Sequence, residues 1–296
     1  MLFDIQHFSL QDGTGVRTTV FFKGCDLRCF WCHNPESQSA AREIAFYPDR
    51  CIRCGVCTQI CPGAQDGATA LHTDRCTRCG RCCGECYSGA LQLLGREQTA
   101  EEIMEDILRD RELYAVSGGG VTFSGGEPFL QPELLAQLLR RCREEGIPTA
   151  VESAVCVPYE VIAPLLPLVD EMICDIKSMD CAAHEAATGQ PNTLILQNIR
   201  AMAGTGRTLL LRTPVIPGFN DTPQAIGEIA AFIASLPGRH RYELLPFRGL
   251  CSGKYAALGR RFDAAELQTP SAETMRGLCG AAAANGADCR VNTVLI

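Results

Sequence analysis

Three cysteines lie within eight residues near the N-terminus, in the stretch KGCDLRCFWCHNPES. They are Cys25, Cys29 and Cys32. Structural metal sites are usually closed by four protein ligands, whereas catalytic sites keep one position open. Three thiolates on a four-iron cube leave one iron without a protein ligand. The spacing therefore predicts an iron-sulfur cluster with one iron available to a chelating small molecule.

An internal repeat contains most of the other clustered cysteines. The runs CIRCGVCTQICPGA and CTRCGRCCGECYSGA share one cysteine spacing and lie 25 residues apart. This spacing matches the run C-x2-C-x2-C-x3-C-P of two-cluster ferredoxins, in which each fourth cysteine binds the other cluster. Two further 4Fe-4S clusters are therefore expected, one on Cys51, Cys54, Cys57 and Cys86 and the other on Cys76, Cys79, Cys82 and Cys61.

The second half of the repeat departs from the ferredoxin run at two positions. Tyr87 stands where the run has its proline, and Cys83 directly follows Cys82 and is a rival ligand. Cys82 is preferred because it preserves the repeat. A pair of zinc ribbons is the alternative, but zinc ribbons are built from two C-x2-C pairs and need no third and fourth cysteine in each half. The other seven cysteines are scattered along the chain and are expected to pack as small apolar residues.

Composition limits the classes of function. The 296 residues, 46% of them hydrophobic, suffice for one large domain and a small module. A formal charge of -7 without any Lys/Arg-rich run argues against a nucleic-acid partner. The N-terminus lacks an export signal, and no apolar run approaches the ~18 residues of a membrane span. A cytoplasmic protein without membrane association is expected, and in that compartment clustered cysteines bind metal more often than they form disulfides.

Apolar strand-like runs alternate with helical patterns along the rest of the chain. Helical periodicity covers, for example, residues 99–114 and 130–146. Strands are expected at 17–24, 120–126, 148–154, 171–178, 208–216 and 241–247. This alternation predicts an α/β fold with a parallel sheet, whose chemistry lies at the carboxyl ends of the strands. Candidate residues at those ends are Cys25, Glu127, Glu152, Asp175, Lys177 and Arg212.

The spacing C-x3-C-x2-C, with Trp31 before the last cysteine, resembles the signature of the radical SAM superfamily. The longer run DGTGVRTTVFFKGCDLRCFWCHNPES resembles the glycyl-radical enzyme activating enzymes, relatives of the pyruvate formate-lyase activase, with Thr14 in place of a proline. Later stretches that resemble motifs of the same family are SGGEP (124–128), DIK (175–177), LRTPVIPGFND (211–221) and ELLPFRGLCSGKYAALG (243–259). The resemblance spans nearly the whole chain.

This resemblance implies a partial (β/α)6 TIM-like barrel of the radical SAM type with an inserted bacterial-ferredoxin-like module. Residues 1–46 and 96–296 would form the barrel, and residues 47–95 the insert with its two clusters. The implied cofactors are S-adenosylmethionine and three 4Fe-4S clusters, of which one binds the S-adenosylmethionine and two are auxiliary.

The resemblance also implies roles for individual residues. The adenine would lie along Trp31, Cys32 and His33, and the methionyl amine beside Gly125, Gly126 and Glu127. The carboxylate of S-adenosylmethionine would face Lys177 and Arg212, with Asp175 near the ribose hydroxyls and Ile176 between them in the motif. Two positions depart from the family pattern: Glu152 lies in VESAVCVP where the family has E/D-T-x-G, and Arg248 replaces a histidine.

The family match favours an activase that cleaves S-adenosylmethionine to a 5′-deoxyadenosyl radical and abstracts hydrogen from a backbone glycine of a partner glycyl-radical enzyme. A radical SAM enzyme that modifies a small molecule or a peptide side chain is the alternative. A pure electron carrier is disfavoured because it has no use for an open iron. Under the first hypothesis the auxiliary clusters relay electrons from a ferredoxin or flavodoxin, and the alternative role for the insert is docking of the partner.

Overall fold

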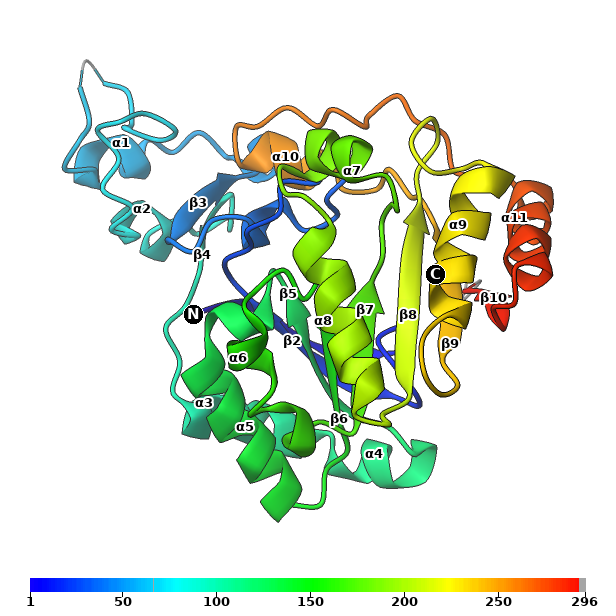
Figure 1. Cartoon of the computed structure of the whole chain (residues 1–296). Helices are drawn as coiled ribbons and strands as arrows, with labels where there is room; N and C mark the ends of the chain where they lie inside the picture. The colour runs from blue at the N-terminus through cyan, green and yellow to red at the C-terminus, as the bar shows by residue number, and fades with distance from the viewer. Residues whose placement is uncertain (66, 293–296) are drawn as a thin grey trace.

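The computed structural model describes residues 1–65 and 67–292, and its centre is one eight-stranded sheet (Figure 1). The strand order is β1-β2-β5-β6-β7-β8-β9-β10. The strands are β1 (Leu2–Ser9), β2 (Arg17–Phe22), β5 (Gly120–Gly125), β6 (Thr149–Ser153), β7 (Glu171–Asp175), β8 (Leu209–Val215), β9 (Arg241–Pro246) and β10 (Cys289–Val291).

All six strands expected from the sequence are present as neighbours in this sheet. From β2 to β10 every pairing is parallel, and β1 pairs antiparallel with β2 at one edge. The six strands from β2 to β9 are joined by helical segments, which confirms the expected partial (β/α)6 barrel. The edge strands β1 and β10 were not expected from the sequence.

Helices cover the outer face of the sheet (Figure 1). The helices of the barrel are α3 (Ala100–Arg109), α4 (Arg111–Ser117), α5 (Pro132–Glu144), α6 (Tyr159–Ile162), α7 (Cys181–Thr188), α8 (Thr193–Gly204), α9 (Pro223–Ala234), α10 (Ser252–Ala257) and α11 (Ala272–Ala284). Short 3-10 turns occur at Pro35–Ser37, Pro48–Arg50, Pro128–Leu130 and Leu166–Leu168. No helix in the described ranges is long and apolar enough to cross a lipid bilayer.

The helix expected over residues 99–114 is two helices in the structure. Thr99 begins α3 with a capping box, because its side chain accepts from the Glu102 N–H and the Glu102 carboxylate accepts from the Thr99 N–H. The chain then breaks at Asp110, and α4 follows. The Asp110 carboxylate accepts a hydrogen bond from Thr18 in β2 and contacts His7 in β1, so the break is tied to the sheet edge.

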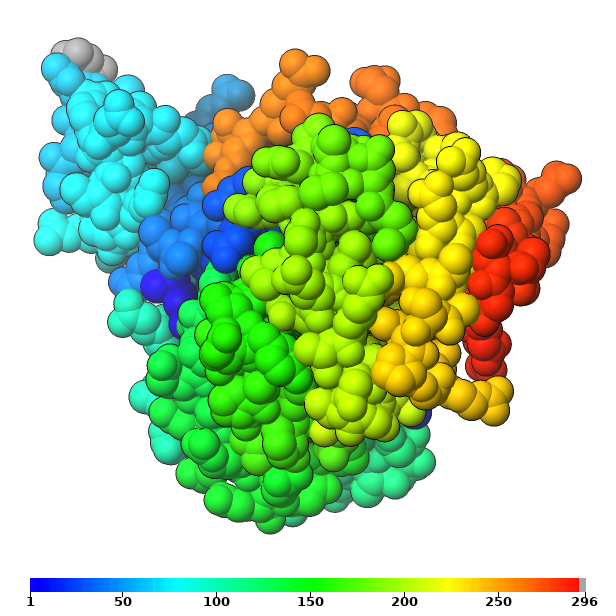
Figure 2. Space-filling model, viewed as in Figure 1, coloured from blue at the N-terminus to red at the C-terminus, as the bar shows by residue number. Residues whose placement is uncertain are grey.

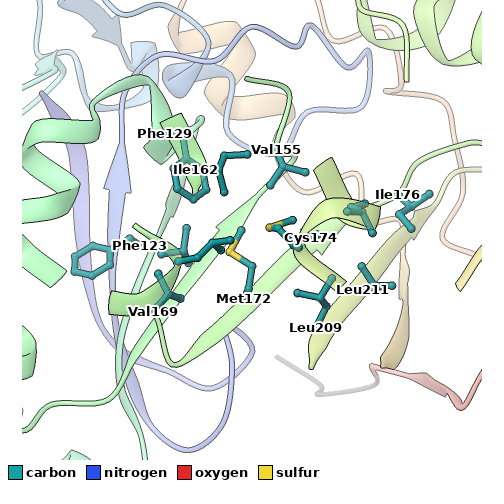
Figure 3. Close-up of a cluster of buried hydrophobic side chains, with 14 of the residues drawn as sticks. Phe123, Phe129, Val155, Ile162, Val169, Met172, Cys174, Ile176, Leu209 and Leu211 are labelled. Atoms are coloured by element: carbon teal, nitrogen blue, oxygen red, sulfur yellow. The ribbon is translucent and has the colours of Figure 1, made fainter. Parts of the chain in front are cut away.

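Alternate residues of each strand point to opposite faces of the sheet, as the two-residue period of a strand requires. The outer set packs against the helices and forms the main core, to which Phe123, Met172, Cys174, Leu209 and Leu211 belong (Figure 3). The inner set contains a small apolar cluster of Ala150, Ile173 and Leu210. Polar side chains follow this inner cluster toward the carboxyl ends of the same strands.

The lobe, defined here as residues 47–95, projects from one side of the barrel (Figures 1 and 2). At its base β3 (Glu43–Phe46) pairs antiparallel with β4 (Leu91–Leu94). The lobe also contains α1 (Val56–Ile60) and α2 (Arg81–Gly84), and α2 packs on both β4 and α1. The strand β3 lies before residue 47, so the predicted boundary falls inside this two-stranded unit.

Candidate functional site

A cavity of about 400 Å³ opens at the carboxyl ends of the parallel strands. Residues from β5, β6, β7 and β8, from the Cys25–Cys32 loop and from the segment after β9 line it together. Cavities at this edge of α/β sheets and barrels are where ligands bind, because the loops that end there converge. The predicted residues that line it are Cys25, Cys29, Trp31, Cys32, His33, Gly125, Gly126, Glu152, Asp175, Lys177 and Arg248.

The cysteine loop is fixed by hydrogen bonds to two distant parts of the chain. The Arg28 N–H donates to the Thr188 carbonyl (2.6 Å) at the end of α7. On the other side, the Tyr255 hydroxyl donates to the Cys32 carbonyl (3.0 Å). Lys254, its neighbour in the KYAALG motif, pairs with Glu36 (2.8 Å). The backbone around the three thiols is therefore positioned before any ligand binds.

Gly125 at the end of β5 and Gly126 directly after it allow the chain to pass close beneath this loop. The Glu127 N–H donates to the Gly24 carbonyl (2.8 Å), and the Gly126 N–H donates to Phe22 (2.9 Å). A Cβ atom on Gly126 would stand 2.1 Å from the Gly24 carbonyl oxygen, so only glycine fits there. The Glu127 side chain points behind the cavity wall and accepts from Ser153 (2.7 Å). Burial raises the pKa of Glu127 to about 7.

Lys177 and Asp175 form an ion pair at the floor of the cavity, with 2.7 Å between Nζ and Oδ2. Burial opposes the charge on Lys177, but the Asp175 carboxylate holds its pKa above the usual value. The backbone here is tied by the fully buried Asn220, whose amide donates to the Lys177 carbonyl (2.8 Å) and accepts from the Ile216 N–H (2.7 Å). The floor therefore presents one ammonium beside one carboxylate.

Arg212 lies below this floor and is held by two carboxylates. It contacts Glu152 on β6 (2.7 Å) and Glu243 on β9 (3.0 Å), and it donates to the Gln11 carbonyl (2.8 Å). Burial opposes its charge, and both carboxylates raise its pKa further above the normal value. The second oxygen of Glu152 accepts from Ser124 on β5 (2.8 Å), so this network links four strands, β5, β6, β8 and β9, under the cavity.

Aromatic and apolar side chains form the wall beside the three cysteines. The Trp31 ring packs on Phe219, with ring centroids 5.0 Å apart, and only 7% of the Trp31 surface is exposed. Leu27, Ile216 and Phe247 belong to the same buried cluster and line the cavity. This wall offers an apolar face for a flat ring, opposite the charged floor.

Three of the residues predicted to contact S-adenosylmethionine lie outside the cavity lining. Glu127 and Arg212 are engaged behind and below it, as described, and Ile176 belongs to the main core on the outer side of the sheet. Sequence reasoning gave no role to Asn34, Ile216 and Phe247, which do line the cavity. All three lie inside motifs that the sequence had singled out, so the motif positions were the available signal.

The lobe repeats its backbone as well as its sequence. Arg53 and Arg78 both adopt a left-handed conformation, with φ of 57° and 54°. Gly55 and Gly80 follow with φ of 77° and 78°, and each directly precedes a helix, α1 or α2. Positive φ in a residue other than glycine is uncommon. The two cysteine loops are therefore built to one local geometry, 25 residues apart.

The thiols of the lobe gather in two groups that cross the repeat. Burial raises the pKa of Cys57, and neighbouring thiols raise it further; these are Cys51, Cys54 and Cys86. Burial likewise raises the pKa of Cys82, with additional contributions from Cys61, Cys76 and Cys79. Burial and the thiol of Cys82 raise the pKa of Cys83 to about 12.

The donor chemistry of the barrel cavity fits an iron-sulfur cluster. Burial raises the pKa of the Cys25 and Cys29 thiols to about 12, so they become thiolates only when a cation compensates their charge. Within residues 1–65 and 67–292, no three His, Cys, Asp or Glu side chains are grouped to ligate a single metal ion. A four-iron cube is larger than one ion, and its ligands stand correspondingly farther apart.

Two family descriptions match the sequence. "Radical SAM superfamily" covers residues 71–233, and "4Fe-4S single cluster domain" covers residues 11–54. The second match contains the Cys25–Cys32 loop.

Curated relatives align over most of the chain. The isethionate sulfite-lyase activating enzyme of Desulfovibrio desulfuricans is 42% identical, over 93% of this chain and 91% of its own. The indoleacetate decarboxylase activating enzyme of Tractidigestivibacter scatoligenes is 38% identical, over 99% of this chain and 97% of its own.

Solved structures share the fold. A domain of a pyruvate-formate lyase-activating enzyme from Bacteroides vulgatus is 33% identical with a TM-score of 0.50, and covers 59% of this chain and 99% of its own. A radical SAM methyltransferase from Sphaerobacter thermophilus has a TM-score of 0.57 at 17% identity, over 93% of this chain and 66% of its own, and supports the fold alone.

Proposed function

We propose a function from one premise: this chain belongs to the radical SAM superfamily and, within it, to the activating enzymes of glycyl-radical enzymes. It activates a partner enzyme by generating a radical from S-adenosylmethionine and abstracting hydrogen from a backbone glycine of that partner. The observation that carries this proposal is the cavity at the carboxyl ends of the strands, where three thiols from one loop face a charged floor and an apolar wall.

Cys25, Cys29 and Cys32 are proposed to hold a 4Fe-4S cluster with one open iron. When bound, the cluster and S-adenosylmethionine supply the reductive cleavage that makes a 5′-deoxyadenosyl radical. The chain's own residues position the thiols and exclude water: the hydrogen-bonded loop keeps the three thiols together, and the apolar wall keeps water from the reacting region.

The cavity lining supports roles for individual residues toward S-adenosylmethionine. Lys177 is proposed to pair with the carboxylate, and Asp175 beside it to accept from the ribose hydroxyls. Trp31 and His33 are proposed to lie against the adenine. The backbone at Gly125 and Gly126 is proposed to approach the amine. Arg248 lines the cavity and is proposed to contact the adenosine.

Four residues that were predicted to contact S-adenosylmethionine are proposed here to act indirectly. Arg212 and Glu152 brace the floor through their ion pair, and Glu127 fixes the turn that carries the two glycines. Ile176 contributes backbone between Asp175 and Lys177 while its side chain packs in the core.

The lobe is proposed to bind two auxiliary 4Fe-4S clusters, on Cys51, Cys54, Cys57 and Cys86 and on Cys76, Cys79, Cys82 and Cys61. The crossed grouping of the thiols and the repeated left-handed loops support this. Residues 47–95 are then an inserted module, and its last strand, β4, pairs with β3 just before the module. These clusters would relay single electrons from a ferredoxin or flavodoxin to the barrel.

The test is an anaerobic assay of the reconstituted protein with S-adenosylmethionine, dithionite and candidate glycyl-radical enzymes. We expect 5′-deoxyadenosine to form and a glycyl doublet to appear by electron paramagnetic resonance in the cognate partner. An isethionate sulfite-lyase is the first partner to try, because the activating enzyme of one such lyase is 42% identical.

The matched control is Cys29→Ala, which should abolish 5′-deoxyadenosine formation while the lobe keeps its iron. If the wild-type protein makes no 5′-deoxyadenosine under these conditions, the proposed function is wrong. If 5′-deoxyadenosine forms but none of a broad panel of glycyl-radical enzymes acquires a doublet, the radical acts on another class of substrate.

A further inference from the structure

The chain enters and leaves the lobe beside one buried lysine. Lys23 directly follows β2, two residues before Cys25, and only 1% of its surface is exposed. Its ammonium donates to the Glu36 carbonyl (2.5 Å), just after the cysteine loop, and to the Glu43 carboxylate (2.8 Å) on β3. Its aliphatic chain lies against Gly95, where a Cβ atom would stand 3.0 Å from the Lys23 Cδ. Lys23 therefore joins the cysteine loop to the segments that lead into and out of the lobe.

Glu43 binds a second cation with its other carboxylate oxygen. This oxygen pairs with Arg260, which also donates to the Pro35 carbonyl (2.7 Å) after the cysteine loop. Arg260 directly follows Gly259, and a Cβ atom on that glycine would stand 3.1 Å from Cγ of His72, a residue of the lobe. The Glu43 carboxylate therefore lies where the base of the lobe, the cysteine loop and the segment after α10 meet.

The segment around α10 extends this contact to the cysteines themselves. The Tyr255 hydroxyl and the Cys251 thiol both donate to the Cys32 carbonyl, at 3.0 and 3.6 Å. Without Glu43, the Lys23 ammonium would keep the neutral Glu36 carbonyl as a partner but lose its carboxylate, and a buried charge without its counter-ion is strongly unfavourable. The lobe is therefore held against the cysteine loop by a charge contact that is costly to break.

We propose that Glu43 is a positioning residue that fixes the lobe against the Cys25–Cys32 loop and thereby sets the rate at which electrons pass from the lobe to the barrel. The inference rests on the proposed function, because it requires the clusters proposed for both regions. In the step, one electron leaves a lobe cluster, which is oxidised by one unit, and the barrel cluster is reduced by one unit without proton transfer. Glu43 takes no part in this step and acts through Lys23 and Arg260.

The experiment follows electrons that are already stored in the protein. The fully reconstituted protein is photoreduced anaerobically with a deazaflavin and then kept in the dark. S-adenosylmethionine is added without a partner enzyme, with a thiol as hydrogen donor, and 5′-deoxyadenosine is measured against time. Because each cleavage consumes one electron, the first equivalent reports the barrel cluster, and later equivalents report electrons that the lobe supplies.

The variant is Glu43→Gln, which keeps an oxygen for Lys23 and removes the charge. The matched control is Glu97→Gln, because Glu97 lies just beyond the lobe and pairs with Arg42 at the surface (3.7 Å), with 74% of its side chain exposed. We expect the first equivalent to form at the wild-type rate in both variants. The later equivalents should form about tenfold or more slowly in Glu43→Gln and at the wild-type rate in Glu97→Gln.

Hydrogen exchange read by mass spectrometry gives a measurement that does not depend on activity. In the Glu43→Gln protein, amides of β3 and β4 should lose protection while those of β5 to β8 keep it. Arg260→Leu removes the other partner of Glu43, and the Arg260 side chain is 30% exposed, so this variant should show the same two effects more weakly. It tests the proposal even if the Glu43→Gln protein does not fold.

Later equivalents at the wild-type rate, equal slowing of the first and later equivalents, or unchanged protection of β3 and β4 would each overturn the positioning role of Glu43. A wild-type protein that stops after one equivalent would also overturn it, because the lobe then supplies no electrons. Failure of the proposed function looks different: the wild-type protein would form no 5′-deoxyadenosine at all.

Discussion

The barrel and the lobe both carry cysteines spaced for iron-sulfur clusters, but they hold them in different ways. In the barrel the Cys25–Cys32 loop is pinned by α7 and by Tyr255, and it packs into a buried cluster that includes Trp31 and Phe247. At the base of the lobe the corresponding apolar cluster has three buried members, of which Cys82 and Leu91 belong to the lobe and Ile44 to β3. Two of the lobe thiols, Cys54 and Cys79, are exposed.

This difference predicts that the lobe depends on its proposed clusters more than the barrel depends on its own. A segment of about 50 residues rarely buries enough apolar surface to fold alone, and metal binding then supplies its folding free energy. The barrel has a large core of its own and is expected to fold without its cluster. The lobe is expected to need its clusters in order to fold.

Iron removal should therefore give the largest contrast. After chelation under reducing conditions, amides in residues 47–95 should lose protection from hydrogen exchange, while amides in β5 to β8 stay protected. Hydrogen exchange read by mass spectrometry compares both regions in one sample. Protection of the lobe in the iron-free protein would contradict this dependence, and reconstitution should restore the protection.

Within the barrel, the ion pairs of Arg212 are expected to matter most. The substitution Arg212→Leu leaves the carboxylates of Glu152 and Glu243 without their partner in a buried place and should cost about 3–5 kcal/mol of unfolding free energy. The matched control is Arg241→Leu, because Arg241 pairs with Glu171 at the surface and should cost about 0–1 kcal/mol. Urea unfolding measures both, and equal losses would show that the buried network is not special.

Close packing under the cysteine loop predicts a smaller loss. A methyl group at position 126 collides with the Gly24 carbonyl, 2.1 Å away, so Gly126→Ala should cost about 1–3 kcal/mol and weaken iron retention at Cys25, Cys29 and Cys32. The control Gly204→Ala meets nothing within 4 Å in α8 and should be neutral or stabilise by up to about 1 kcal/mol. Denaturation midpoints and iron content check both. A Gly126→Ala protein with unchanged stability and iron content would show that this contact does not hold the loop.

The smallest expected effect concerns one hydrogen bond. Tyr255→Phe removes the donor to the Cys32 carbonyl and should cost about 0.5–1.5 kcal/mol, with a modest slowing of S-adenosylmethionine cleavage. Tyr87→Phe is the control, since its side chain is 91% exposed on the lobe and its stability should not change. Thermal unfolding of the iron-loaded proteins compares the two substitutions. If the Tyr255→Phe and Tyr87→Phe proteins unfold at the same midpoint temperature, Tyr255 has no positioning role.

The parallel strands β2 and β5 to β8 could be predicted because both of their faces are largely buried, and such strands have continuous apolar runs such as TLLLRTPVI. β1 has one exposed edge and a mixed pattern, LFDIQHFS, and β10 is only three residues long, so neither gave such a signal. The three-cysteine loop was likewise recoverable because its ligands are close in sequence.

The surroundings of Arg212 were not recoverable from local sequence. Its partners Glu152 and Glu243 lie 60 and 31 residues away, and only the strand order brings them together. The position of Ile176 could have been predicted from the sequence, because strand alternation places its side chain on the face opposite to those of Asp175 and Lys177.

The central claim is that the barrel cluster keeps one iron free of protein ligands. The most direct measurement uses the Cys54→Ala/Cys79→Ala protein, in which each proposed lobe cluster loses one thiolate. It compares the electron paramagnetic resonance spectrum of the reduced barrel cluster with and without S-adenosylmethionine. The account predicts that the spectrum changes when S-adenosylmethionine binds the open iron. A spectrum that stays the same at saturating S-adenosylmethionine would contradict it.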